Sequence, residues 1–317
     1  MNEIKFGYWP RKIELRIGRA VIKPVRNYED HVALMEQSSR ALNGWLYPPL
    51  IAEAERGGRS LKQTLIYARR YSTAPTHSLL LPASLKSQAR GEFLIALLGM
   101  MEGLRLVPEG WVHFYRTAIK LNALSDVHCN RQDLETVLAI GLNFWDRATV
   151  KIRRLMFGAI HWRLFAESYE HEFERFAGQY TVLDTCWKIC EDHLPPKWWQ
   201  KWTRSKGVPH AIRARLLAKQ YGIPIPSWAK TRKNSAKPTK AFYSKLSTLR
   251  NGLIHEGVYG QKPIGFGYPK NFKGSPDLAL RAFNTRLILA ILGVKCEYVT
   301  TSCETRCAFL LDLRRTK

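Results

Sequence analysis

The chain has 317 residues, of which 45% are hydrophobic, and it carries 50 Lys and Arg against 26 Asp and Glu, a net charge of +24. This length exceeds the roughly 250–300 residues that one hydrophobic core supports, so we expect two domains. The charge excess attracts dense arrays of phosphate, which indicates a polyanion, RNA foremost, as the partner. No run of about 20 apolar residues occurs, so we expect no membrane partner.

The cysteines and the N-terminal segment indicate the compartment. Six cysteines in a chain of this length are too few for a disulfide scaffold. The first residues lack the basic-then-apolar order of a secretory signal, so we expect a cytoplasmic protein. Cys186 with Cys190, and Cys303 with Cys307, are i, i+4 pairs that zinc could use, but structural zinc sites favour tighter spacings. We therefore expect no metal and no cofactor.

The N-terminal half is predicted to be mostly helical after one or two short strands. Alternating apolar and polar residues at 13–17 predict strands within residues 4–25, which Pro24 ends. The segment from Pro75 to Pro82 is predicted to be a loop. Helices are expected at residues 30–43, 50–72, 92–106, 134–145 and 152–165.

The C-terminal half is predicted to be a helical bundle, because its apolar residues recur at three- and four-residue steps. Its helices are expected at residues 170–193, 209–221, 241–259 and 277–292. The fold class expected for the whole chain is mainly α. We expect a recognition or regulatory domain at residues 1–165, the bundle at 166–295 and a C-terminal tail at 296–317.

One predicted helix contains residues suited to catalysis. Arg250 and Asn251 precede His255 there. On an α-helix Asn251 and His255 share a face, whereas Arg250 points about 140° away and lies about 7.5 Å back along the axis. The long arginine side chain can close that gap, especially if a second subunit supplies part of the site.

These residue types suit the cleavage of RNA by transesterification. An imidazole can take the proton of a ribose 2′-hydroxyl or protonate the leaving 5′-oxygen. A guanidinium can neutralise the charge that builds up on phosphorus. The amide of Asn251 could orient the imidazole or the phosphate. This chemistry requires no metal.

The same spacing occurs a second time, at Arg26, Asn27 and His31. That copy lacks an apolar stripe and contains Glu29 and Asp30, which would repel a phosphate. We interpret it as a loop and the start of a helix.

The segment Arg250-Asn251-Gly252-Leu253-Ile254-His255 resembles the signature of HEPN domains, and its neighbourhood looks most like the Apea-like HEPN group. The likeness covers about residues 166–295, including a first helix with Phe176, Gln179-Tyr180 and Leu183-Asp184. The resemblance implies a helical bundle that forms a homodimer through its signature helices. It also implies metal-independent endoribonuclease activity, often in toxins and antiviral defence, with Arg250 and His255 as catalytic pair and Asn251 beside them. Gly252 within the helix suggests a close helix–helix approach or a bend.

Two cationic segments are predicted to contact nucleic acid. The first interleaves three tryptophans with Lys197, Lys201 and Arg204, so that rings stack on bases and cations contact phosphates; packing of a tryptophan in the core is the equal alternative. The second precedes the signature helix and includes Lys233, Lys237 and Lys240, for which a solvated charge run is the alternative.

Three functions stay open. The first is a HEPN-type ribonuclease; the second is a non-catalytic RNA- or DNA-binding HEPN module; the third is a scaffold subunit of a ribonucleoprotein. A regulatory protein partner would be compatible with the first. The chain has no Gly-rich phosphate loop, Gly-x-Ser-x-Gly or His-Glu-x-x-His motif, which argues against kinase, hydrolase and zinc-protease functions.

Overall fold

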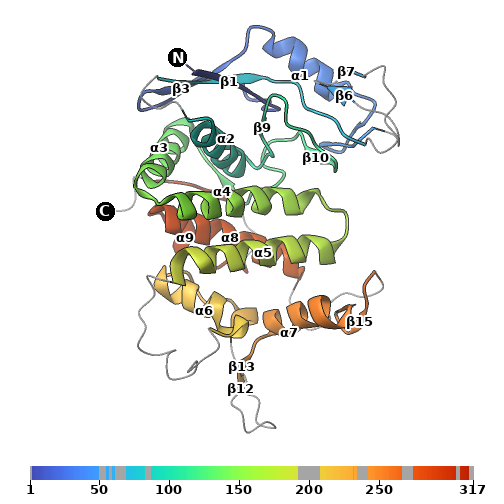
Figure 1. The fold of residues 1–317 in the computed structure, drawn as a ribbon, viewed down its shortest axis with the longest axis vertical. Coiled ribbons are helices and arrows are strands. Elements are labelled where there is room, and N and C mark those ends of the chain that lie inside the picture. The colour runs from blue at the N-terminus through green and yellow to red at the C-terminus, as the bar shows by residue number, and fades with distance from the viewer. Residues whose placement is uncertain are drawn as a thin grey trace. The chain divides into compact units, whose positions relative to one another are not determined.

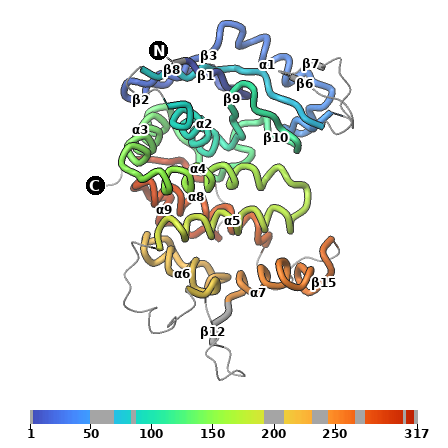
Figure 2. Tube along the Cα trace, in the orientation of Figure 1, coloured from blue at the N-terminus to red at the C-terminus, as the bar shows by residue number. Residues whose placement is uncertain are grey.

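The computed structural model describes residues 2–49, 55–56, 59–60, 69–82, 87–191, 208–230, 232–233, 242–265, 274–304 and 308–313. The chain divides into two compact units (Figures 1 and 2). The first consists of Met1–Ala148, Glu167–Tyr169 and Ala308–Leu313, and the second of Thr149–Ala166, Glu170–Cys307 and Arg314–Lys317. Over the described ranges, no helix combines the length and the apolar character needed to cross a membrane.

The first unit is built on a five-stranded antiparallel sheet with the order β2-β3-β8-β1-β9. Its strands are β1 (Asn2–Gly7), β2 (Leu15–Ile17), β3 (Ala20–Pro24), β8 (His77–Leu81) and β9 (Val107–Pro108). In the register, Leu79 lies opposite both Ile4 and Ile22, and all three are buried. This face of the sheet therefore belongs to the core.

Two helices pack closely in this core, where glycine permits the approach. Helix α2 (Gln88–Glu102) lies against the sheet at Gly91, where a Cβ would stand only 2.3 Å from Cδ1 of Ile4. Helix α3 (Arg131–Arg147) meets α2 at Gly141, where a Cβ would stand 2.3 Å from Cδ2 of Leu97. A side chain at either glycine would force the helices apart.

A smaller sheet in the same unit has the order β10-β5-β4. Its strands are β4 (Ala41–Leu42), β5 (Trp45–Leu46) and β10 (Thr117–Ala118). The two-residue turn between β4 and β5 is Asn43-Gly44, with φ of 51° and 81°, as a tight hairpin requires. Helix α1 (Tyr28–Glu36) precedes it. Two further strand pairs join β6 (Glu55–Arg56) to β7 (Arg59–Ser60) and β11 (Val127–His128) to β16 (Phe309–Leu310).

The prediction of a mainly α fold class is therefore wrong, because the first unit combines sheets with helices. Strand β8 occupies the predicted loop 75–82; it is almost wholly buried and so lacks the alternation that marks a half-exposed strand. Helix α1 ends at Glu36, and residues 41–42 of the predicted helix 30–43 form β4. In the predicted helix 50–72, residues 55–56 and 59–60 are strands, and residues 50–54, 57–58 and 61–68 lie outside the described ones.

The second unit is a helical bundle. Its helices are α4 (Val150–Phe165), α5 (Glu172–Cys190), α6 (His210–Gln220), α7 (Lys245–Asn251), α8 (Pro276–Leu292) and α9 (Glu297–Thr300). Helices α4, α5 and α8 pack against one another, α6 packs on α5, and α7 on α6. Two short strand pairs flank α7: β12 (Arg232–Lys233) with β13 (Phe242–Tyr243), and β14 (Val258–Tyr259) with β15 (Lys262–Pro263).

A buried polar network fixes the three central helices of this bundle. The side-chain amide of Asn284 on α8 donates to the backbone oxygen of Gln179 on α5 at 2.8 Å and to its Oε1 at 3.1 Å. Nε2 of Gln179 in turn donates to the backbone oxygen of Arg163 on α4 at 3.0 Å. Helix α4, predicted within the N-terminal domain 1–165, thus belongs to the bundle. Strand β16, predicted within the tail 296–317, belongs to the first unit.

Candidate functional site

The segment that carries Arg250, Asn251 and His255 begins as an α-helix with a well-formed N-terminus. The backbone N–H of Ser247 donates to Oγ of Ser244 at 3.1 Å, and the N–H of Ser244 donates to Oγ of Ser247 at 2.9 Å. This reciprocal cap satisfies backbone donors that the first turn leaves free. Leu246 and Leu249 are buried, so α7 is anchored on the bundle by its apolar side.

Helix α7 does not continue as an α-helix through the predicted range 241–259. From Gly252 to Glu256 it becomes a π-helical turn, η6. Gly257 ends this turn with φ of 64°, and its N–H donates to the carbonyl of Gly252, five residues back. Such turns insert an extra residue per turn and occur frequently at functional sites.

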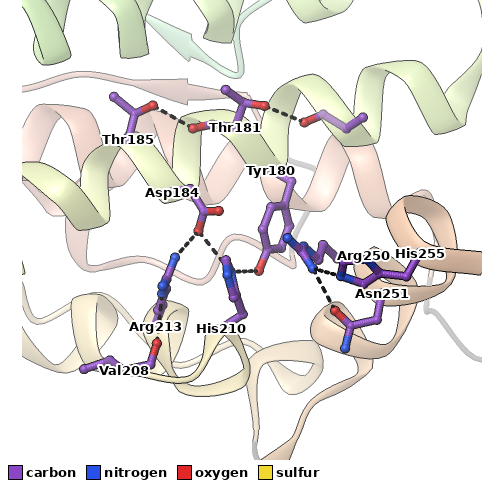
Figure 3. Close-up of polar contacts among 11 residues, drawn as sticks. Tyr180, Thr181, Asp184, Thr185, Val208, His210, Arg213, Arg250, Asn251 and His255 are labelled. Carbon is purple, nitrogen blue, oxygen red and sulfur yellow. Dashed lines mark hydrogen bonds and ion pairs between the residues drawn. The ribbon is translucent and has the colours of Figure 1, made fainter. Parts of the chain in front are cut away.

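The π-helical turn brings Arg250 and His255 together. Nη1 of Arg250 lies 2.8 Å from Nε2 of His255 and donates to Oδ1 of Asn251 at 3.0 Å (Figure 3). The α-helical geometry expected from the sequence, with Arg250 about 140° away, is wrong here because a π turn places residues five apart on neighbouring turns of one face. The three predicted residues form one cluster.

The contact with Arg250 bears on the tautomer of His255. A guanidinium has donors only, so Nε2 of His255 is the acceptor, and a neutral imidazole then carries its proton on Nδ1. His255 and Asn251 are exposed and Arg250 is half-buried. A cation and a proton acceptor therefore lie side by side at the surface of the second unit.

The ring of Tyr180 on α5 packs against Arg250. The centre of its ring lies 5.9 Å from Cζ of Arg250, within the range of a cation–π contact. Its hydroxyl lies 3.1 Å from Nδ1 of His210, at the start of α6. The ring is 5% exposed, and burial, followed by the charge of Asp184, raises the pKa of its hydroxyl. Tyr180 is therefore a neutral, rigid support.

Asp184, one helical turn after Tyr180, completes the support (Figure 3). Its Oδ1 accepts from Nη1 of Arg213 at 2.9 Å and lies 3.4 Å from Nδ1 of His210. Burial acts to raise the pKa of Asp184, but hydrogen bonds and charges from His210 and Arg213 outweigh it and leave the pKa below its ordinary value. Nε of Arg213 also donates to the carbonyl of Val208. The carboxylate thus holds α6 against α5.

These supporting residues had no site role in the sequence prediction. Tyr180 and Asp184 were noted only as part of the resemblance, and His210 and Arg213 come from another helix. The i, i+4 spacing of Tyr180 and Asp184 is the one sequence signal that could have indicated a shared polar face.

The chain after η6 is fixed as firmly as the chain before it. Tyr259 in β14 is 1% exposed, and its hydroxyl donates to Oε1 of Glu172 at the start of α5, at 2.8 Å. A Cβ on Gly252 would lie 3.1 Å from Cγ2 and 3.2 Å from the carbonyl oxygen of Val258. The close neighbour of Gly252 is therefore strand β14 of the same chain, and not another helix as predicted. Both ends of the π-helical turn are anchored.

The predicted cationic segments cannot be placed at the site. Lys197, Lys201, Arg204, Lys237 and Lys240 lie outside the described residues. Lys233 belongs to β12, where it pairs with Phe242, and its side chain is outside the description. Their contact with nucleic acid stays a prediction.

The cysteine pair on α5 lies in the interior. Cys186 and Cys190 are buried, and Sγ of Cys190 lies 3.2 Å from the hydroxyl of Tyr221. Burial raises the pKa of both thiols, that of Cys190 to about 11. Cys307 lies outside the described residues. Within the described ranges no three His, Cys, Asp or Glu side chains gather closely enough to hold a metal ion.

The second copy of the spacing has a different structure. Asn27 precedes the first residue of α1, Arg26 is exposed, and Nδ1 of His31 lies 2.5 Å from the carbonyl oxygen of Pro75. This is the loop and helix start expected from the sequence. The same spacing therefore occurs at this position without a π-helical turn.

In comparisons with known proteins, no family model, no curated protein and no solved structure matches the chain.

Proposed function

We propose that the chain is a HEPN-type endoribonuclease that works without a metal ion, in a toxin or antiviral defence role. The observation that carries the proposal is the 2.8 Å contact between Nη1 of Arg250 and Nε2 of His255 at an exposed position. A cation beside a proton acceptor is what the cleavage of a ribose-linked phosphate needs. The excess of positive charge suits RNA as the substrate.

The proposed reaction is a transesterification. A phosphate that binds Arg250 draws the guanidinium away from His255 and frees Nε2. The imidazole takes the proton of the 2′-hydroxyl, the 2′-oxygen attacks phosphorus, and the bond from phosphorus to the 5′-oxygen breaks. A second imidazolium protonates that oxygen. The products are a 2′,3′-cyclic phosphate and a free 5′-hydroxyl, so atoms and protons balance.

We infer that the second imidazole comes from another copy of the chain, in a homodimer formed through α7 and η6. One His255 then acts as base and the other as acid, while two guanidinium groups share the phosphate. Ile254, adjacent to His255, is 56% exposed and supplies this face with an apolar contact. The Tyr180 and Asp184 support keeps each half of the site rigid, which favours catalysis at a shared position.

The test is cleavage of RNA by the purified chain in the presence of a chelator. We expect wild type to release fragments with 2′,3′-cyclic phosphate and 5′-hydroxyl ends. His255→Ala and Arg250→Ala should lower the rate by about a hundredfold or more, as loss of an acid–base group or an electrostatic group does. Arg26→Ala, which removes an exposed arginine from the second copy of the spacing, is the matched control and should cleave normally.

The competing function is a non-catalytic RNA- or DNA-binding HEPN module, or a ribonucleoprotein scaffold. It is favoured by the fact that Nη1 of Arg250 is already engaged by Asn251 and His255. Equal retention of RNA by wild type and His255→Ala, without cleavage by either, would support it. A chain that cleaves RNA while monomeric by light scattering would contradict the shared site.

A further inference from the structure

The small sheet β10-β5-β4 has one side committed to the core of the first unit. Leu46 is fully buried, Thr117 is 2% exposed and Ile119 is 8% exposed. Leu46 and Ile119 belong to a cluster with Tyr8, Met35, Tyr71 and Ala74. Because successive residues of a strand point to opposite sides, the neighbours of these residues point away from the cluster.

The other side of this sheet carries Leu42, Trp45 and the buried Ala118. We call this side, together with the flanking residues Phe114, Tyr115, Arg116 and Lys120, the open face. Leu42 lies opposite Trp45 in the hairpin, so both point the same way, and Leu42 is 60% exposed. Cζ of Arg116 lies 4.3 Å from the centre of the Trp45 ring. Lys120 lies against the turn, since a Cβ built on Gly44 would be 2.9 Å from the Cβ of Lys120.

The loop that leads into β10 adds two exposed rings. Phe114 is 55% exposed and Tyr115 is 44% exposed. The loop is held in place, because the backbone oxygen of Tyr115 accepts from the hydroxyl of Tyr71 at 2.9 Å and the Tyr115 ring meets Tyr169 edge-on at 5.1 Å. Arg116 donates to the carbonyl of Tyr169. These rings are therefore presented by a fixed backbone.

The open face is apolar and cationic at once, whereas the solvent side of an antiparallel sheet is ordinarily polar. Residues 37–52 and 110–125, which supply the face, contain no Asp or Glu. An exposed ring next to a guanidinium matches what single-stranded nucleic acid offers, a base beside a phosphate. A duplex would bury its bases and leave the rings without a partner.

We propose that the open face binds unpaired RNA. Bases stack on Phe114 and Tyr115, while Arg116, held by Trp45, and Lys120 contact the phosphates. Binding here does not depend on cleavage at Arg250 and His255, and it gives the first unit the role of substrate recognition.

The test is the affinity of the full chain for a short fluorescent oligouridylate whose 2′-hydroxyls are methylated. This probe has no nucleophile and stays intact whether or not the chain is a nuclease. An abasic strand of the same length separates stacking from charge. Phe114→Ala should weaken binding of the oligouridylate about fivefold or more, the lower end of what stacking contributes, and leave the abasic strand unaffected. Leu310→Ala, which removes an exposed apolar side chain of the same unit, is the control and should bind normally.

A charge variant tests the other half of the proposal. Arg116→Gln should weaken the binding of both oligonucleotides and reduce its dependence on salt, because one phosphate contact is lost. Phe114→Ala should leave the salt dependence unchanged. Circular dichroism confirms that each variant is folded. Equal affinity of wild type for both strands would overturn the proposal. So would a folded Phe114→Ala chain that binds the oligouridylate as tightly as wild type.

Discussion

Nη1 of Arg250 and Nε2 of His255 lie 2.8 Å apart because the helix that carries them changes from α to π at Gly252. In an unbroken α-helix the two side chains would diverge by about 140°. The change lengthens the turn by one residue, so that the side chains of two residues five apart in the sequence come into contact. Its consequences can be measured separately from any reaction.

The first consequence is the tautomer of His255. Arg250 can only donate, so the neutral imidazole should carry its proton on Nδ1. Nitrogen-15 NMR at mildly alkaline pH distinguishes the two ring nitrogens. We expect the Nδ1–H form to dominate in the wild type and the preference to disappear in Arg250→Ala. A wild type with its proton on Nε2 would contradict the contact.

The second prediction concerns the ring of Tyr180, whose centre lies 5.9 Å from Cζ of Arg250. Tyr180→Phe keeps this ring and loses only the hydrogen bond to His210, so it should cost about 1 kcal/mol of stability and keep most of the cleavage activity. Tyr180→Leu removes the cation–π contact and should reduce cleavage severalfold further.

Unfolding in urea separates these effects from simple loss of fold. Tyr221→Phe is the matched control, because it removes another partly buried hydroxyl, bonded to Cys190, away from Arg250. Its cleavage rate should equal that of wild type. If Tyr180→Leu, once folded, also cleaves at the wild-type rate, the ring has no positioning role.

The three central helices of the bundle, α4, α5 and α8, were predictable from the sequence because they are long and their apolar residues recur at helical steps. The start of α8 at Pro276 and the close of that helix at Gly293 follow the usual proline and glycine positions. The signature residues were also identifiable, since their spacing and apolar neighbours are local properties. The π-helical turn could not be predicted from the sequence, because it depends on the contacts of Val258 and Tyr259 in β14, the strand that follows it.

The sheets of the first unit were missed for a different reason. Strands of two residues, such as β4 and β5, carry too little periodicity to detect, and their hairpin signal Asn43-Gly44 lay at the end of a predicted helix. Strand β8 pairs with β1 and β3, from 53 or more residues away, and such non-local pairing has no local signature.

The third prediction is a pH dependence of stability due to Asp184. Its folded-state pKa lies below the ordinary value, so the unfolded chain binds its proton more readily than the folded chain. The stabilisation is fully present above the unfolded pKa of about 3.9 and is lost as the pH falls through the folded value. Asp184→Asn should therefore be less stable than wild type at pH 7, with the difference shrinking below about pH 4.

Urea unfolding across this pH range provides the measurement. Glu14→Gln, which removes one carboxylate from the exposed ion pair with Arg16, is the control and should change stability by less than about 0.5 kcal/mol. A difference between wild type and Asp184→Asn that stays constant down to pH 3 would show that the carboxylate charge is not what stabilises α6 against α5.

The last prediction concerns Arg286 on α8, which is fully buried and bonds to α9 and to the two residues that follow it. Its Nε donates to the carbonyl of Thr301 at 3.1 Å, its Nη2 to the carbonyl of Ser302 at 3.4 Å, and its Nη1 to the hydroxyl of Tyr298 at 3.0 Å. An ammonium cannot reach all of these acceptors, so Arg286→Lys should cost about 3 kcal/mol. In Arg286→Lys, amide hydrogen exchange at residues 297–302 should accelerate more than exchange in α5. Arg215→Lys, at an exposed position on α6, is the control and should change neither exchange rate. Equal acceleration at residues 297–302 and in α5 would mean that Arg286 stabilises the bundle as a whole rather than the packing of residues 297–302 against it.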